Sequence, residues 1–218
     1  MSQGISFTDI KEILINIADK IMREKEYLTR LDAACGDGDL GVVMYIGFRK
    51  TKEKIEKDES NDVGSLLMAV GSAILSSVGG ASGPLFGTIF LEAGKTVKGK
   101  NELTLNDIAS MFEASLSKAK SLGGAKVGDK TLIDAFEPAV KSLREAISEG
   151  FRLEDALDKA AEEAEHGTDS TKDLVARHGK ARYLGEKSIG YIDPGAKIVR
   201  FIFETLASTY RSIASRGT

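Results

Sequence analysis

Hydrophobic residues recur every three or four positions along most of the chain, which is the period of an amphipathic α-helix. The first such stretch runs from Phe7 to Ile21, and the last begins at Pro194 and continues through Tyr210. Between them, the same pattern predicts helices over residues 41–57, 63–78, from Pro84 onward, 104–122, 131–150, 152–166 and 168–178. Runs that alternate apolar and polar residues, as strands do, are absent from the sequence.

Short connections between helices indicate antiparallel neighbours, so the pattern predicts an all-α bundle, with residues 1–218 forming a single domain. In an up-and-down bundle, loops alternate between the two ends. Glycine-rich loops at 36–39, 79–83 and 123–128 follow the first, third and fifth predicted helices. We therefore expect these three loops to lie together at one end, where a functional site belongs.

Composition narrows the function classes further. The 218 residues carry a net charge of only −3, so no broad basic surface is available to hold nucleic acid. A single cysteine, Cys35, fits a reducing compartment, and neither a secretion signal nor a membrane span is predicted. We expect a cytoplasmic protein.

The first candidate site is the segment LDAACGDGDLG, which places Asp32, Asp37 and Asp39 within eight residues. No lysine or arginine lies between these carboxylates to relieve their repulsion. A hard divalent cation such as Mg²⁺ or Ca²⁺ would relieve it, and the glycines permit the tight fold that this requires. The alternative interpretation is a solvated turn whose aspartates cap the next helix.

Three more segments fit a phosphate ligand. GGASGPLFGT places glycines before a helix start, where free amides and the helix dipole attract anions, although such starts are also common without a ligand. GDKTLID offers a cation, or simply a capped helix start with Asp134 solvated. The loop from Gly179 to Gly195 carries Lys180 and Arg182, but surface loops often contain such charges.

No nucleophile or general base stands out. Cys35 lies among carboxylates that would raise its pKa, so we interpret it as a buried packing residue. His166 and His178 lack an evident serine or carboxylate partner and are expected at the surface or at helix ends. A site with metal ligands and phosphate loops but no nucleophile suits phosphoryl transfer, in which positioning and charge neutralisation dominate.

Taken in order, LDAACGDGDLG, GGASGPLFGT, GDKTLIDAFEPA and ARYLGEKSIGYIDPGA resemble the nucleotide-binding L-type subunit of dihydroxyacetone kinases. The resemblance implies an eight-helix antiparallel barrel with ADP or ATP at its rim and two Mg²⁺ ions on Asp32, Asp37 and Asp39. It implies nucleotide or phosphate contacts at Leu40, Gly41, Val42, Val43, Ala81, Ser82, Gly123, Leu132, Lys180, Asp193, Pro194 and Gly195. Thr88 and Asp129 match the motifs without an assigned role.

The resemblance also implies partners. A K-type subunit holds the ketone through a histidine, so no catalytic residue is expected on this chain. An M-type phosphocarrier of the phosphotransferase system recharges ADP in some members, while others consume ATP, and a transcription regulator binds some L-type subunits. A tetrulose substrate, a non-catalytic nucleotide sensor and a structural Ca²⁺ site are the alternatives.

Four positions depart from the family pattern. Leu40 and Val43 stand where the family usually has histidine and asparagine, and neither can hydrogen-bond to phosphate. Lys180 replaces an arginine, keeping the charge but losing the bidentate fork, and Arg182 replaces a serine.

Overall fold

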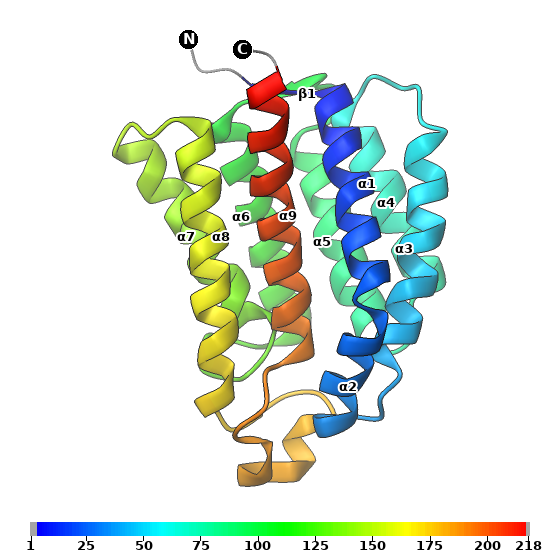
Figure 1. Ribbon diagram of the computed structural model, residues 1–218, viewed down its shortest axis with the longest axis vertical. Helices are drawn as coiled ribbons and strands as arrows, with labels where there is room; N and C mark the ends of the chain where they lie inside the picture. The colour runs from blue at the N-terminus through cyan, green and yellow to red at the C-terminus, as the bar shows by residue number, and fades with distance from the viewer. Residues whose placement is uncertain (1–3, 217–218) are drawn as a thin grey trace.

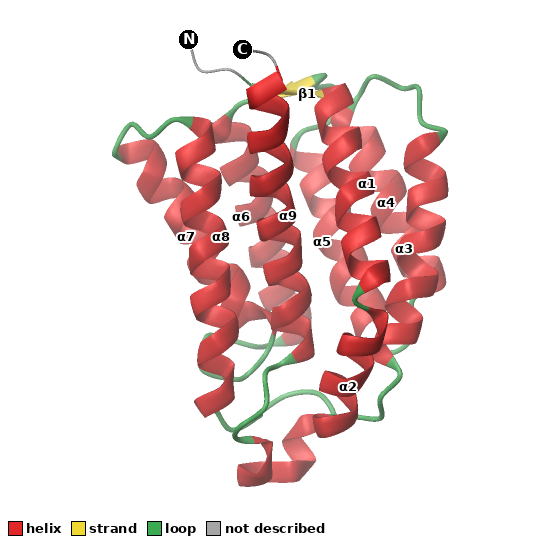
Figure 2. Ribbon diagram, in the orientation of Figure 1, coloured by secondary structure: helices red, strands yellow, loops and turns green. Residues whose placement is uncertain are grey.

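Long antiparallel helices form the wall of a barrel in the computed structural model, which describes residues 4–216 (Figures 1 and 2). The start of the chain, on which the expectation of no secretion signal rests, lies partly outside these described residues. The long helices are α1 (Phe7–Arg23), α2 (Lys25–Cys35), α3 (Leu40–Glu56), α4 (Val63–Ser77), α5 (Ser82–Thr96), α6 (Leu105–Gly123), α7 (Leu132–Ser148), α8 (Leu153–Ser170) and α9 (Pro194–Arg216). Two short 3₁₀ helices, η1 (Thr171–Asp173) and η2 (Ala181–Ser188), precede α9. The expected all-α barrel is confirmed.

A two-residue antiparallel ribbon is the exception to the helical pattern. Strand β1 (Ile5–Ser6) pairs with β2 (Glu102–Leu103), placing Ile5 opposite Leu103 at the end of the barrel where α1 begins and α9 ends (Figure 2). None of the helices within residues 4–216 is long and apolar enough to cross a membrane.

The structure corrects the predicted boundaries in two places. Helix α2 was not predicted, because it buries only Leu28 and Cys35 and therefore shows no apolar stripe. The helix predicted over 168–178 is wrong: Thr168 continues α8, and residues 174–178 are not helical. Gly167 lets this end of α8 pass close to α7, since a Cβ there would lie 2.1 Å from the carbonyl oxygen of Asp134.

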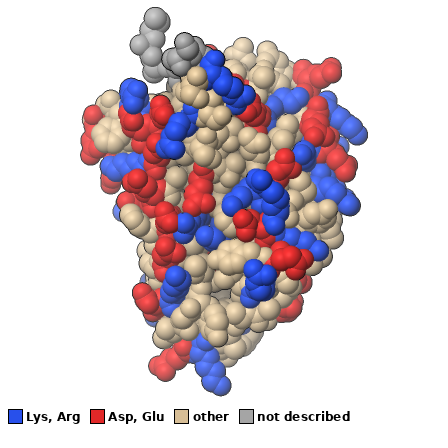
Figure 3. Space-filling model, in the orientation of Figure 1, with Lys and Arg blue, Asp and Glu red and all other residues tan. Residues whose placement is uncertain are grey.

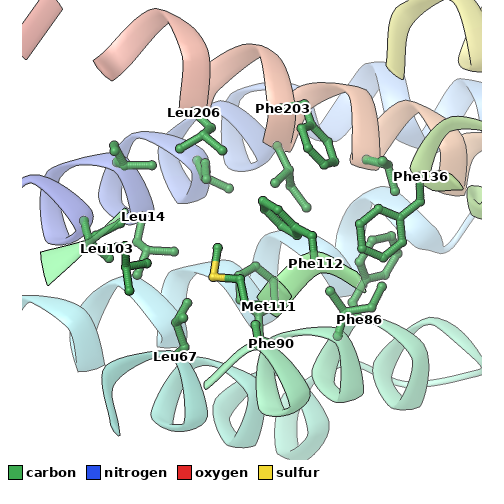
Figure 4. A pocket seen from close by; sticks show the side chains of 17 residues that line it. Leu14, Leu67, Phe86, Phe90, Leu103, Met111, Phe112, Phe136, Phe203 and Leu206 are labelled. Carbon is green, nitrogen blue, oxygen red and sulfur yellow. The ribbon is translucent and has the colours of Figure 1, made fainter. Parts of the chain in front are cut away.

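The apolar stripes meet along the barrel axis. Phe112, Phe136 and Phe203 form an aromatic cluster with ring centroids 4.9 to 6.1 Å apart. Beside it lies a cavity of about 50 Å³ whose lining side chains are all apolar (Figure 4). This core fixes the helix ends and thus the loops that the helices carry.

Helices α4 and α5 approach each other unusually closely through glycines. A Cβ at Gly71 would lie 2.7 Å from the carbonyl oxygen of Gly87, and one at Gly94 would lie 2.5 Å from that of Gly64. The contact partners are backbone atoms, which cannot rotate away. This close packing positions the glycine loop that joins the two helices.

Gly71→Ala is therefore expected to lower the free energy of unfolding by about 1–3 kcal/mol, because the added methyl overpacks the α4–α5 contact. Urea denaturation followed by circular dichroism measures this loss. Ser72→Ala, at an exposed position on the same helix, is the matched control and should change stability little. Equal stability of the two variants would contradict the account of the packing.

Candidate functional site

The end of the barrel opposite the ribbon gathers the segments singled out by their composition. The loops after α2, α4 and α6 and the long segment between α8 and α9 all lie there (Figure 1). The long segment contacts two of these loops directly: the Lys180 ammonium donates to the Asp37 carboxylate, and the Arg177 amide donates to the carbonyl of Asp129. The prediction that the glycine-rich loops share one end is confirmed.

Asp32, Asp37 and Asp39 converge. Each offers a carboxylate oxygen, and these oxygens lie within 4.8 Å of one another. Asp32 comes from the last turn of α2, and the other two come from the loop that follows it. Gly36 and Gly38 allow this sharp turn: a Cβ at Gly36 would lie 2.4 Å from Asp32 Oδ1, and Gly38 has a φ of +74°.

The electrostatics of the three carboxylates suit a cation. Burial raises the pKa of Asp32, as does repulsion from Asp37 and Asp39, while the hydrogen bond from the Leu40 amide opposes the rise. The hydrogen bond from Lys180 holds the pKa of Asp37 below its usual value. Oxygen donors that repel one another in this way fit a hard divalent ion such as Mg²⁺.

The alternative of simple helix capping holds for Asp32 but not for Asp37 or Asp39. Asp39 occupies the N-cap position of α3, but its side chain makes no capping hydrogen bond. Instead, the Leu40 amide donates to Asp32 Oδ2, eight residues earlier, at 3.2 Å. Asp37 and Asp39 are thus left exposed and directed to the same place as Asp32.

The first turn of α3 holds this arrangement by packing. The Leu40 side chain is buried in the core, Val43 packs against the core, and Val42 is 40% exposed. Gly41 faces α2 so closely that a Cβ would lie 2.1 Å from the carbonyl oxygen of Lys25. The residues from Leu40 to Val43 therefore contribute apolar packing and one amide bonded to Asp32, and none of them has a polar side chain.

The glycine loop leads into α5 without a side-chain cap. Ala81 is the N-cap, Ser82 begins the helix, and Gly80 has a φ of +67°. A Cβ at Gly79 or Gly80 would meet nothing within 4 Å, so the loop faces open space. Uncapped amides at the positive end of a helix are suited to an anion.

The loop between α6 and α7 adds two more of the predicted positions. Gly123 ends α6, and Leu132 begins α7 and is buried against Gly195, whose Cβ would lie 3.4 Å from that of Leu132. Thr131 caps α7 as expected, donating its own amide to Asp134 and accepting from Ile133. Asp134, however, is buried, and the expectation that it is solvated is wrong.

The turn Asp193-Pro194-Gly195 starts α9. Asp193 Oδ2 accepts the Ala196 amide at 2.7 Å, and the Asp193 amide donates to Thr171 Oγ1 at 3.0 Å. Burial raises the pKa of Asp193 to about 7, with the Ala196 hydrogen bond opposing the rise. The turn is thus bonded to the end of α8 rather than free in solvent.

Two side chains in this region have partners that sequence analysis missed. The expectation that His178 has no carboxylate partner is wrong, because its Nε2 lies 3.2 Å from Asp129 Oδ2. Lys130 is buried and donates to the carbonyls of Thr171 and Tyr191. Both contacts join residues more than forty positions apart, and no sequence pattern encodes such pairing.

The remaining candidates agree with the expectation of structural roles. Cys35 is a buried free thiol, and burial, reinforced by Asp193 and Asp32, raises its pKa against the effect of Lys130. His166 is exposed and faces Glu163 at 3.9 Å. Neither residue has the setting of a nucleophile or a general base.

Comparison with known proteins agrees with this geometry. Residues 34–208 match the model of the DAK2 domain. The chain is 42% identical to the ADP-binding subunit DhaL of the PEP-dependent dihydroxyacetone kinase of Escherichia coli, covering 94% of this chain and 97% of that protein. It is 35% identical to the ADP-binding subunit DhaL of a PTS-dependent dihydroxyacetone kinase of Lactococcus lactis, covering 86% and 90% of the two chains.

A solved structure shows the same fold. The dihydroxyacetone kinase of C. freundii in complex with AMP-PNP and Mg²⁺ superposes with a TM-score of 0.71 at 26% identity. The match covers 96% of this chain and 35% of that one, so this chain spans about a third of that enzyme.

The chain belongs to the DAK2 domain family. Within that family, it is similar over nearly its whole length to the DhaL subunits of bacterial dihydroxyacetone kinases.

Proposed function

We propose that this chain is the nucleotide-binding subunit of a dihydroxyacetone-type kinase and that residues 1–218 act as one L-type domain. The observation that carries the proposal is the convergence of Asp32, Asp37 and Asp39 at the end of a DAK2 barrel that also presents an uncapped glycine loop. The similarity to proteins named as ADP-binding subunits supports it.

The three aspartates would hold Mg²⁺, and two ions are proposed because the resemblance to L-type subunits implies two. Mg²⁺ held there would supply positive charge to offset the charge that develops on the phosphates during transfer. This chain's own part is positioning: the aspartates on one side, and the amides near Ala81 and Ser82 on the other. Gly123, Leu132 and the turn at Asp193 would complete the nucleotide site.

Lys180 would supply the remaining positive charge. Its ammonium donates to Asp37 and is drawn towards Asp39 and Asp32 as well. Leu40 and Val43 contribute no side-chain donor, and their amides already donate to Asp32 and Asp39, so phosphate contact there would depend on Lys180. Replacement of a guanidinium by an ammonium leaves a point charge without bidentate geometry.

The acceptor would be presented by another protein. No nucleophile lies at the site among residues 4–216, which fits a K-type subunit that holds the small hydroxyketone. Acidic and basic side chains mix along the barrel wall, whereas uncharged residues dominate the site end in the view of Figure 3. Tyr183, Leu184, Ile189 and Tyr191 are exposed apolar residues of that end, and such a surface suits protein docking.

The phosphoryl donor and the setting belong to the same proposal. An M-type phosphocarrier is the proposed donor, because relatives are named PEP-dependent and PTS-dependent kinases. A transcription regulator is proposed as a further protein partner, and the cytoplasm as the location.

Reconstitution tests the proposed function. The purified chain is mixed with dihydroxyacetone, a K-type subunit and either Mg-ATP or a phosphorylated M-type protein, and the phosphorylated ketone is measured. We expect product only when this chain is present, with erythrulose as a parallel acceptor to define the substrate. Tight Mg-ADP binding without product from either donor would refute the kinase assignment.

We also expect the purified protein to release ADP in stoichiometric amount when it is denatured, because an L-type subunit recharged in place keeps its nucleotide as a coenzyme. Chromatography of the supernatant measures the released nucleotide. Protein that carries no nucleotide yet supports turnover with Mg-ATP would instead make ATP the exchanging substrate.

A further inference from the structure

Two consecutive residues of the loop between α6 and α7, Asp129 and Lys130, are buried at 5% and 3% exposure. Lys130 also adopts a left-handed backbone with a φ of +60°, a conformation that costs a residue with a side chain about 1 kcal/mol. Burial lowers the pKa of Lys130, and nearby carboxylates oppose this. A charged side chain held at such cost needs strong partners, and both residues find theirs in the segment between α8 and α9.

Lys130 bonds to both ends of the 172–190 loop. Its ammonium donates to the carbonyl of Thr171, just before the loop, and to that of Tyr191, just after it. The amide of Gly190 donates to the carbonyl of Lys172 at 2.7 Å and so joins the last residue of the loop to the first. We call this junction the neck of the loop. One buried cation therefore ties together the entry and the exit of the loop.

Asp129 bonds to the middle of the same loop. Its carbonyl accepts the Arg177 amide at 3.1 Å, and its carboxylate lies 3.2 Å from His178 Nε2. The hydrogen bonds from the Lys126 amide and from His178 outweigh burial and keep the pKa of Asp129 below its usual value, so it acts as a carboxylate. Lys180, which donates to Asp37, follows His178 by only two positions.

We propose that Asp129 and Lys130 are positioning residues: they fix the 172–190 loop on the barrel and thereby place Lys180 beside the metal-binding aspartates. The inference rests on the proposed function for its ligand, Mg-nucleotide. Neither residue touches that ligand in this account, and their effect on binding passes through Lys180. The contacts of Lys130 hold the two ends of the loop together at its neck. Those of Asp129 fix the position of Arg177 and His178, which lead to Lys180.

Trypsin digestion tests the placement without any ligand. Lys180, Arg182 and Lys187 are exposed trypsin sites inside the loop. In Lys130→Met, cleavage at these sites is expected to accelerate at least about tenfold, because loss of the neck bonds lets the loop open locally. Lys118→Met, the same change at an exposed position of α6, should cleave like the wild type. Unchanged cleavage in folded Lys130→Met would overturn the proposal.

A double-mutant cycle separates positioning from general damage. Calorimetry with Mg-ADP, on protein first freed of bound nucleotide, measures the effect of Lys180→Ala in the wild type and in Lys130→Met. We expect about a tenfold loss in the wild type and less than about a twofold further loss in Lys130→Met, because the two residues act through one contact. Equal losses in both backgrounds would show that Lys130 acts independently of Lys180 and would contradict the proposal.

A second variant covers the case in which Lys130→Met does not fold. In that case, His178→Ala replaces it in both arms, since it removes the contact with Asp129 from a partly exposed position. A wild-type protein that does not bind Mg-ADP would refute the proposed function, whereas the trypsin comparison would still decide whether the pair holds the loop.

Discussion

Asp37→Ala is expected to abolish Mg²⁺-dependent ADP binding while leaving the helical content unchanged. Asp37 is exposed and supports no helix through its side chain, so its removal costs the fold little. It does remove one of three converging metal ligands and the partner of Lys180. We expect affinity for Mg-ADP to fall by at least about a hundredfold, as measured by calorimetry.

The control for this variant is Glu26→Ala. Glu26 is an exposed carboxylate on α2 whose nearest cation is Lys25 at 3.7 Å. Its removal changes the net charge by the same amount as Asp37→Ala without touching the three aspartates. Asp37→Ala that binds Mg-ADP like Glu26→Ala would show that the nucleotide does not depend on this cluster.

Gly41→Ala gives the second large effect, through packing rather than through a ligand. The new Cβ would lie 2.1 Å from the carbonyl oxygen of Lys25 and 2.3 Å from Thr29 Oγ1. Helix α2 has only Leu28 and Cys35 buried, so it yields to the clash and carries Asp32 away from its partners. We expect stability to fall by about 1–3 kcal/mol and Mg-ADP affinity to fall at least about tenfold.

Gly94→Ala separates these two effects. Its Cβ would lie 2.5 Å from the carbonyl oxygen of Gly64, at the opposite end of the barrel from the site. It should therefore lower stability by a similar amount and leave Mg-ADP affinity unchanged. If both glycine variants lose affinity equally, the loss would reflect general destabilisation and not displacement of Asp32.

Much of the fold and of the candidate site follows from the sequence. These features depend on the period of the hydrophobic residues and on the alternation of loops between the two ends of a bundle. The stripe from Phe7 to Ile21 makes α1, and the order of helices places three glycine-rich loops at one end. The spacing of Asp32, Asp37 and Asp39 within a glycine-rich turn predicts that their carboxylates meet, and their oxygens do lie close together.

Other features depend on three-dimensional packing and have no local pattern. Helix α2 packs against α3 at Gly41 rather than through an apolar stripe, so hydrophobic periodicity does not predict this helix. His178 and Asp129 are 49 positions apart, so no local pattern predicts their contact. The burial of Lys130 likewise cannot be predicted, because a lysine in a turn is ordinarily exposed to solvent. The resemblance implies that Gly41 contacts nucleotide. The structure gives a separate reason for a glycine there, because the close approach of α2 leaves no room for a Cβ.

The most direct test of the central claim is to locate the metal. Crystals grown with ADP and Mn²⁺ in place of Mg²⁺ allow anomalous scattering to mark each ion. The account predicts Mn²⁺ coordinated by Asp32, Asp37 and Asp39 and by phosphate oxygens of ADP, with two peaks if two ions bind. Mn²⁺ and ADP bound away from these aspartates, or ADP bound with no metal at them, would contradict it.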